Sequence, residues 1–134
     1  MIVRETKIRV CYADTDKMGV VYYGNYPRFY EIGRNELIRG IGISYKNLEK
    51  EGILLPARSL NINYIKSAYY DDMLTVRTIV DEIPMVKFPI KTEIYNEKGD
   101  LINNGKVVLA FYNNIRNKPC RPPIEFIDIL KNYF

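Results

Sequence analysis

The chain has 134 residues, of which 47% are hydrophobic and 27% are charged, and its formal net charge is +4. This length and composition fit a globular chain with its own hydrophobic core, so we expect a single domain over residues 1–134. Two cysteines are too few for a disulfide framework, and with no histidine the chain offers no plausible zinc site. Disordered, disulfide-rich and zinc-dependent classes are therefore excluded.

The positive charge is modest and spread along the chain, so it fits an anionic small molecule at least as well as a nucleic acid. No RRM, KH or zinc-finger signature is present, and we expect no nucleic-acid partner. No apolar run approaches the roughly 18 residues of a membrane span. Residues 1–6 lack the apolar region of a signal peptide. We expect no membrane span and a cytoplasmic location.

The first predicted element is a strand over residues 5–12, where charged and apolar side chains alternate. Asp14 and Asp16 follow, then a glycine turn at Gly19 and an apolar and aromatic run over residues 20–26. Such a segment can hold a carboxylate beside free backbone N–H groups at a helix start. Hydrolysis of an ester or thioester needs a group that attacks or activates water and donors aimed at the oxyanion. With no histidine, any acid–base chemistry must use a carboxylate, Lys, Tyr or Cys.

Two helices are predicted next. Residues 27–39 place apolar side chains at three- and four-residue spacing, with polar side chains on the other side. Pro27 suits the first turn of this helix and Gly40 supplies its stop. Residues 44–50 predict a short second helix capped by Ser44.

Four strand-like stretches follow, separated by turn residues: 60–64, 74–80, 86–94 and 101–112. Pro89 predicts a bulge or an edge in the third of them. Residues 119–134 predict an extended tail followed by a short docking helix. One long helix and an antiparallel sheet can bury each other only if the sheet curls around the helix. The predicted fold class is therefore α+β.

The pattern Asp-x-Asp-x-x-Gly at residues 14–19, the run Val-Val-Tyr-Tyr-Gly-Asn-Tyr at residues 20–26 and the helix that follows form one dense motif. Residues 12–39 thereby resemble the hotdog-fold acyl-CoA thioesterases of the 4-hydroxybenzoyl-CoA thioesterase type, and the order of elements agrees over nearly the whole chain. The resemblance implies a hotdog fold, with five or six antiparallel strands wrapped around one long central helix. It also implies hydrolysis of acyl-CoA thioesters to free acid and coenzyme A. Subunits would join edge to edge as a homodimer or homotetramer, with active sites at the subunit interface.

In this family the catalytic carboxylate is the second acid of the motif, so the resemblance implies that Asp16 is the catalytic group. The backbone N–H that polarises the carbonyl falls at Tyr23, and only the backbone of that residue is implied. The tyrosine side chains within residues 20–26 are expected to pack, and Asp14 is expected to cap or orient the loop. Lys87 lies in a strand that contributes phosphate contacts in the family, which makes it a candidate for binding coenzyme A. We expect no metal ion and no cofactor other than the coenzyme A of the substrate.

Several alternatives stay open from the sequence. Asp16 could attack the carbonyl to give a mixed anhydride or could deprotonate a water molecule. Both acids of the motif could instead be turn residues. The chain could be a non-catalytic acyl-CoA binding module, or a thioesterase for acyl groups bound to a carrier protein. Arg34 and Glu36 could be solvated or could form an ion pair between subunits. The chain length and aromatic character of the acyl group are not determined.

Overall fold

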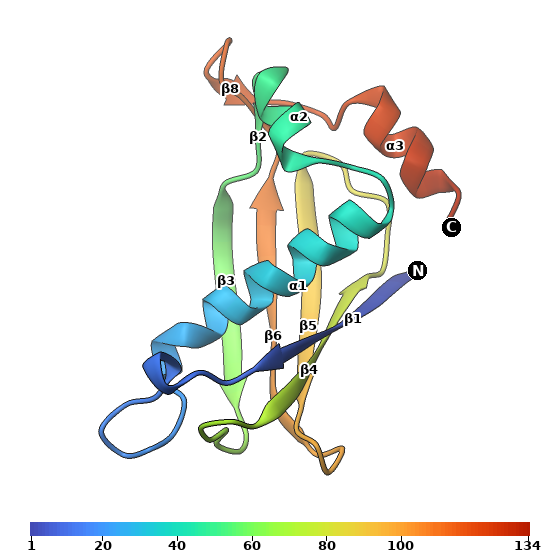
Figure 1. The fold of residues 1–134 in the computed structure, drawn as a ribbon. Helices are drawn as coiled ribbons and strands as arrows, with labels where there is room; N and C mark the ends of the chain where they lie inside the picture. The colour runs from blue at the N-terminus through green and yellow to red at the C-terminus, as the bar shows by residue number, and fades with distance from the viewer.

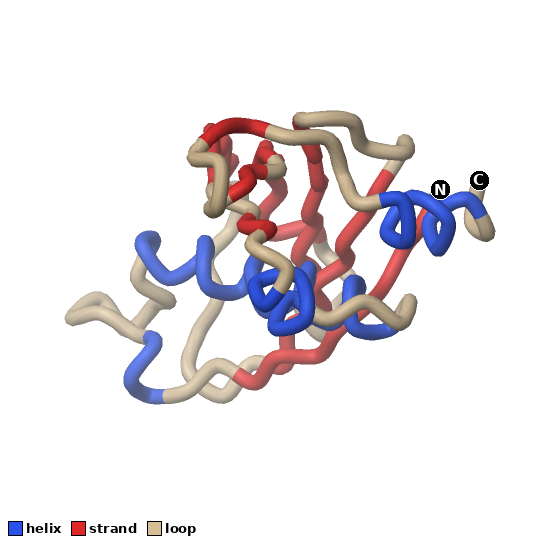
Figure 2. Tube along the Cα trace, turned by 90° about the horizontal axis from the view of Figure 1, so that it is seen from above, coloured by secondary structure: helices blue, strands red, loops and turns tan.

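The computed structural model describes all residues from 1 to 134. Five strands form one antiparallel sheet in the spatial order β1-β4-β5-β6-β3. Their bounds are Ile2–Arg9 for β1, Ala57–Tyr64 for β3, Met73–Val80 for β4, Lys87–Tyr95 for β5 and Leu101–Ala110 for β6. Helix α1, Tyr26–Gly40, lies across one face of this sheet (Figure 1). The view from above shows the sheet bending around the helix (Figure 2), which confirms the predicted α+β hotdog fold.

Both predicted helices before the strand region are confirmed. In α1, Phe29, Tyr30 and Leu37 are buried against the sheet, and Pro27 lies in the first turn. The shorter helix α2, Tyr45–Lys50, begins after Ser44. The Ser44 hydroxyl accepts a hydrogen bond from the Asn47 N–H at 3.4 Å, which satisfies one of the free donors at the helix start.

The first strand differs from the prediction for residues 5–12. It begins at Ile2, whose side chain is buried in the core and whose backbone is opposite Val80 of β4. It ends at Arg9, because residues Tyr12–Asp14 form a 3-10 turn, η1, instead of continuing the ladder. Asp14 therefore lies in a turn and not at the end of a strand.

The other predicted strands correspond to β3, β4, β5 and β6, and of the bulge or edge predicted at Pro89 the structure has the edge and not the bulge. Pro89 pairs with Val108 of β6 in regular register, and the irregularity of β5 lies between Ile94 and Tyr95. The ladder between β4 and β5 ends at the pair Ile79 and Lys91. Because Pro89 lies beyond the last β4 pair, its missing N–H removes no hydrogen bond on that side.

A small second sheet was not predicted. Strands β2 (Ile53–Leu54), β7 (Tyr112–Asn113) and β8 (Lys118–Pro119) pair in the order β2-β7-β8. The predicted docking helix is confirmed as α3, Ile124–Lys131, with Phe126 and Leu130 buried. No helix of the chain has the length and apolar character needed to cross a membrane.

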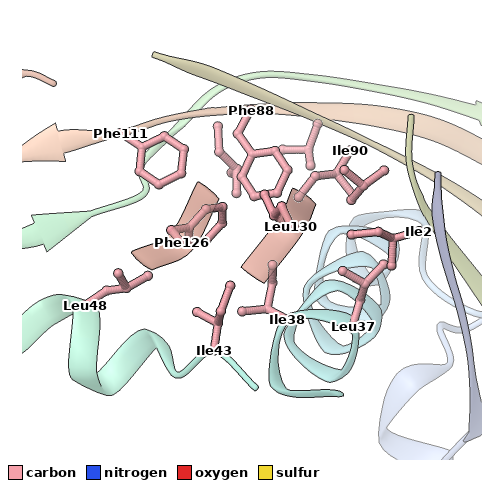
Figure 3. Packing of buried hydrophobic residues seen from close by; sticks show 13 residues of the cluster. Ile2, Leu37, Ile38, Ile43, Leu48, Phe88, Ile90, Phe111, Phe126 and Leu130 are labelled. Carbon is pink, nitrogen blue, oxygen red and sulfur yellow. The ribbon is translucent and has the colours of Figure 1, made fainter. Parts of the chain in front are cut away.

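The buried side chains fall into two clusters. The larger contains 13 residues and gathers around Phe88, Phe111 and Phe126, whose ring centroids are 5.1 to 5.9 Å apart. Figure 3 shows these rings beside Ile38 of α1 and Leu130 of α3. The smaller cluster contains 10 residues and includes Tyr26, Phe29 and Tyr30 from the first half of α1. The loop with the two acids lies at this second end of the molecule.

Candidate active site

Asp16 lies in a tight loop that its own backbone and side chain help to close. Its N–H donates to the Val20 carbonyl at 2.9 Å, and its carbonyl accepts from the Gly19 N–H at 3.0 Å. Oδ1 of the carboxylate accepts from the Met18 N–H at 2.8 Å. Gly19 has a φ of +81°, a conformation that favours glycine, and this lets the chain reverse here. Because Oδ2 takes part in none of these bonds, it remains available for chemistry.

The Tyr23 N–H lies at the start of a second 3-10 turn, η2, Tyr23–Asn25. The first N–H groups of such a turn have no partner within it. The carbonyl of Tyr22, in the same peptide unit, accepts from the Asn25 N–H at 2.9 Å. The C=O and N–H groups of a trans peptide unit point in opposite directions. Because the Tyr22 carbonyl points toward Asn25 of η2, the Tyr23 N–H points away from η2. The N–H is thus a free, oriented donor.

Asp16 and Tyr23 line the same cavity, which has a volume of about 290 Å³. Tyr26 and Tyr64 form part of its wall, and the Tyr64 hydroxyl donates to the Tyr23 carbonyl at 3.2 Å. The remaining lining residues are Val20, Val21, Ile65, Lys66 and Ser67. The structure therefore brings together the two residues that the motif predicted, in a cavity with apolar and aromatic walls and one carboxylate.

The tyrosines of the motif do not all pack as expected. Tyr26 is buried, and its burial raises the pKa of its hydroxyl. The rings of Tyr22 and Tyr23, however, are 45% and 64% exposed, so the packing prediction is wrong for these two within one subunit. Their rings contact each other, with centroids 4.8 Å apart, and Tyr23 also lines the cavity.

Asp14 has the contacts of a residue that orients the loop. It is only 6% exposed, and its Oδ1 forms an ion pair with Arg28 in the first turn of α1. Its Oδ2 accepts from the Cys11 N–H at 2.8 Å. Its carbonyl accepts from the Tyr22 N–H at 2.9 Å and from Asn25 Nδ2 at 2.8 Å. The carboxylate is therefore fully engaged.

Lys87 lies far from this cavity within the subunit. It is exposed at the start of β5 and borders a different cavity of about 500 Å³ together with Lys106. In the sheet register, Tyr64 is level with Ile94, seven residues farther along β5 than Lys87. At about 3.3 Å per residue this separation is roughly 23 Å along the strands. Asp16 and Lys87 are not brought together in one subunit.

Arg34 and Glu36 have different surroundings. Glu36 pairs with Arg39 on the same helix. Arg34 borders a polar cavity of about 240 Å³ with Glu31 and Tyr45. Burial raises the pKa of the Tyr45 hydroxyl, and the nearby Arg34 charge opposes this shift. No group of three or more His, Cys, Asp or Glu side chains is placed to hold a metal ion.

Sequence reasoning missed the contributions of Arg28 and Tyr64. In the sequence, Arg28 has only the pattern of a residue on the polar side of α1, whereas in the structure it pairs with a residue 14 positions earlier. Tyr64 reaches the loop from the end of β3, 41 residues after Tyr23. Neither contact has a local sequence signal, because both depend on how α1 and β3 pack around the loop.

Comparison with known proteins places these features in a family. The model of the thioesterase-like superfamily matches residues 10–130. The acyl-CoA thioester hydrolase YbgC of Escherichia coli is 31% identical over 120 residues, which cover 90% of each chain. A DHNA-CoA thioesterase from Staphylococcus aureus is 40% identical with a TM-score of 0.91, over 99% of this chain and 89% of that chain. A mutant 4-hydroxybenzoyl CoA thioesterase complexed with 4-hydroxybenzoyl CoA has a TM-score of 0.85 over 96% of this chain and 99% of that chain; at 22% identity it shows the fold alone.

Proposed function

We propose that this chain, which belongs to the thioesterase-like superfamily and is a thioesterase, hydrolyses acyl-CoA thioesters with Asp16 as its catalytic carboxylate. The observation that carries this proposal is the shared cavity of Asp16 and the unpaired Tyr23 N–H. The products are the free acid and coenzyme A. The alternative is a non-catalytic acyl-CoA binding module, which release of free thiol from an acyl-CoA thioester would exclude.

The proposed chemistry uses two groups. Tyr23 donates its N–H to the thioester oxygen, which becomes negative as the tetrahedral intermediate forms. Asp16 either attacks the carbonyl carbon, so that the thiolate of coenzyme A leaves and water then cleaves the mixed anhydride, or takes a proton from the attacking water. The free Oδ2 of Asp16 suits both routes, because Oδ1 is already bonded to the Met18 N–H. No metal ion or cofactor is needed, and activity should survive dialysis against a chelator.

We place the subunit interface at β3. This strand is at the edge of the sheet and pairs only with β6. Seven of its eight residues are exposed, including Leu60 at 44% and Tyr64 at 52%. An unpaired edge of this kind is a template for another strand. A second copy pairing antiparallel along β3 would form a closed two-fold homodimer, and two such dimers could form a homotetramer.

This assembly would complete the site. Antiparallel pairing of β3 with its copy places the Tyr64 end of one strand beside the Ala57 end of the other. Ala57 is level with Phe88 in the sheet register, because both are opposite Leu109, and Lys87 is the residue before Phe88. The Lys87 side of one subunit would therefore lie near the Asp16 cavity of its partner. A coenzyme A held at that cavity would extend toward Lys87, whose ammonium group suits phosphate.

The acyl group is the least defined part of the substrate. Tyr23, Tyr26 and Tyr64 line the cavity, and Tyr64 meets the other two rings edge-on. Such walls suit an aromatic acyl group, since edge-to-face contacts between rings are favourable. Together with the likeness to the DHNA-CoA thioesterase, this makes aryl-CoA thioesters the first to test. A cytoplasmic location is part of the proposal, and acyl groups on a carrier protein serve as comparison substrates.

The decisive experiment measures release of free thiol from a panel of aryl- and alkyl-CoA thioesters. Asp16→Asn should lower kcat by at least about a hundredfold, as loss of a principal acid–base group does, and leave the melting temperature close to wild type. Asp81→Asn is the matched control, because Asp81 is exposed and pairs with Lys91 away from the cavity. Retention of more than about a tenth of wild-type activity in Asp16→Asn would refute the assignment.

Lys87→Ala tests the coenzyme A contact. Loss of one charge-assisted phosphate contact should raise KM roughly tenfold and leave kcat nearly unchanged. Lys98→Ala, which changes an exposed lysine in the turn after β5, should leave both constants unchanged. An unchanged KM for Lys87→Ala would show that another group binds the phosphates.

A further inference from the structure

We infer that Arg28, Asp14 and Asn25 form a positioning clamp that sets the Asp16 carboxylate and the Tyr23 N–H relative to each other. The inference rests on the proposed function, since it concerns the same two groups. None of the three clamp residues lines the cavity. They act through the backbone that carries Asp16 and Tyr23.

The first part of the clamp fixes Asp14 to the central helix. Its buried carboxylate is bonded on one oxygen by the Arg28 guanidinium and on the other by the Cys11 N–H. Arg28 lies in the first turn of α1, where the helix dipole disfavours a cation, and the Asp14 charge offsets that cost. The guanidinium carbon is also 5.2 Å from the ring centroid of the buried Phe29. The loop is thereby attached to a rigid element.

The second part connects Asp14 to both catalytic groups. Asp16 follows two residues later, directly after Thr15, which forms an isolated β-bridge with Val21. On the other side, the Asp14 carbonyl accepts from the Tyr22 N–H at 2.9 Å. Tyr22 carries the carbonyl of the peptide unit whose N–H belongs to Tyr23. Asp14 therefore fixes the backbone just before the Asp16 carboxylate and just before the Tyr23 N–H.

Asn25 fixes the remaining rotation of that peptide unit. Its backbone N–H donates to the Tyr22 carbonyl at 2.9 Å, and its side-chain Nδ2 donates to the Asp14 carbonyl at 2.8 Å. Rotation of the peptide unit that carries the Tyr23 N–H would break the first of these bonds. The hydrogen bond from Asn25 Nδ2 connects η2 directly to Asp14, two residues before Asp16. Loss of the Arg28 contact would loosen the whole arrangement, because Asp14 would keep a buried, half-bonded carboxylate.

The test compares Arg28→Ala with Arg39→Ala. Arg39 is an exposed arginine of the same helix that pairs with Glu36. Arg28→Ala should lower kcat about 10- to 100-fold and change KM less than about threefold, because misplacement of reacting groups by about 1 Å costs up to about a hundredfold. Arg39→Ala should match wild type. Added methylguanidine should restore part of the kcat of Arg28→Ala, since the Arg28 side chain is 51% exposed and its site can be reached from solvent.

Amide exchange gives a readout that does not depend on activity. Arg28→Ala should accelerate hydrogen exchange at the Tyr22 N–H, which Asp14 holds, while amides in the core of β5 and β6 keep their wild-type rates. Two results would overturn the clamp: slower turnover of Arg28→Ala that methylguanidine does not restore, or a hydrogen-exchange rate at the Tyr22 N–H that is the same in Arg28→Ala as in wild type. If Asp16→Asn abolishes turnover and Arg28→Ala does not lower kcat, the clamp fails and the proposed function stands. If Asp16→Asn keeps its activity, the proposed function fails, and the exchange measurement alone decides whether Arg28 orders the loop.

Discussion

The two ends of α1 differ in what they bury. At the C-terminal end, Phe88, Phe111 and Phe126 pack with aliphatic side chains in a closed cluster that includes α3. At the N-terminal end, Tyr26 and Phe29 are buried, but Tyr22 and Tyr23 remain exposed, and Tyr23 lines an open cavity. One end thus buries its aromatic rings, whereas the other keeps aromatic surface available for a substrate or a second subunit.

The difference shows how one small fold separates stability from chemistry. The closed cluster buries aromatic rings, each of which contributes to the free energy of folding in proportion to the apolar area removed from water. The open end instead contains hydroxyls, a free carboxylate and an unpaired N–H. These groups cost stability if they are buried without partners. We expect mutations at the closed end to change stability and mutations at the open end to change turnover.

Phe126→Ala should produce the largest effect on stability. Phe126 is 2% exposed and contacts both Phe88 and Phe111, so its removal leaves a cavity and should lower the free energy of unfolding by about 3–5 kcal/mol. Urea denaturation measures this value. At a temperature where the variant is still folded, kcat should equal that of wild type. Phe134→Ala, which changes a ring that is 48% exposed at the C-terminus, should alter stability by less than about 0.5 kcal/mol. A folded Phe126→Ala protein with impaired turnover would contradict the separation of the two ends.

Leu60→Glu tests whether the open end is completed by a partner. Pairing of β3 with its copy would bring the two introduced carboxylates close together, and like charges on neighbouring strands repel. We expect light scattering to show a dimer or tetramer for wild type and a monomer for Leu60→Glu, with turnover reduced at least about tenfold. Ile115→Glu adds the same charge at a side chain that is 77% exposed, in the turn between β7 and β8, and should leave the assembly intact. If wild type is a monomer at micromolar concentration, the active site is not completed by a second subunit.

The sequence predicted most of the fold, and pointed to two residues that share one cavity, because these signals are local. The spacing of apolar residues gave α1, and the order of turns gave the strands of the sheet. Asp16 and Tyr23 lie within one motif, so a single segment pointed to both. The contacts that hold them were not predictable in the same way, because Arg28 reaches Asp14 and Tyr64 reaches Tyr23 across the folded structure. The small sheet was also missed, since strands of two residues have no periodicity to detect.

The smallest predicted effect concerns Tyr30, which is buried in the smaller cluster. Its hydroxyl donates a hydrogen bond to Asn103 Oδ1 in the interior. Burial raises the pKa of this hydroxyl most, and the nearby Tyr64 and Tyr26 hydroxyls raise it further. An unfolded tyrosine has a pKa of about 10, so above that pH the unfolded chain loses a proton that the folded chain keeps. The folded state then binds more protons, and stability must fall as pH rises, by at most about 1.4 kcal/mol per pH unit for this group. Below that pH the Tyr30 contribution is fully present.

Urea denaturation at several pH values between neutrality and about pH 11 measures this slope. Tyr30→Phe should be less stable at neutral pH by about 1–3 kcal/mol, because the buried Asn103 side chain loses its partner. Its stability should nevertheless fall less steeply above about pH 10 than that of wild type. Tyr26 and Tyr45, whose pKa values burial also raises, remain in the variant, so part of the slope persists. Tyr12→Phe, which changes a ring that is 79% exposed, should keep the wild-type slope. Identical slopes for Tyr30→Phe and wild type would show that the Tyr30 hydroxyl reaches solvent in the folded chain. The solvent-accessible part of the open end would then extend along α1 as far as Tyr30.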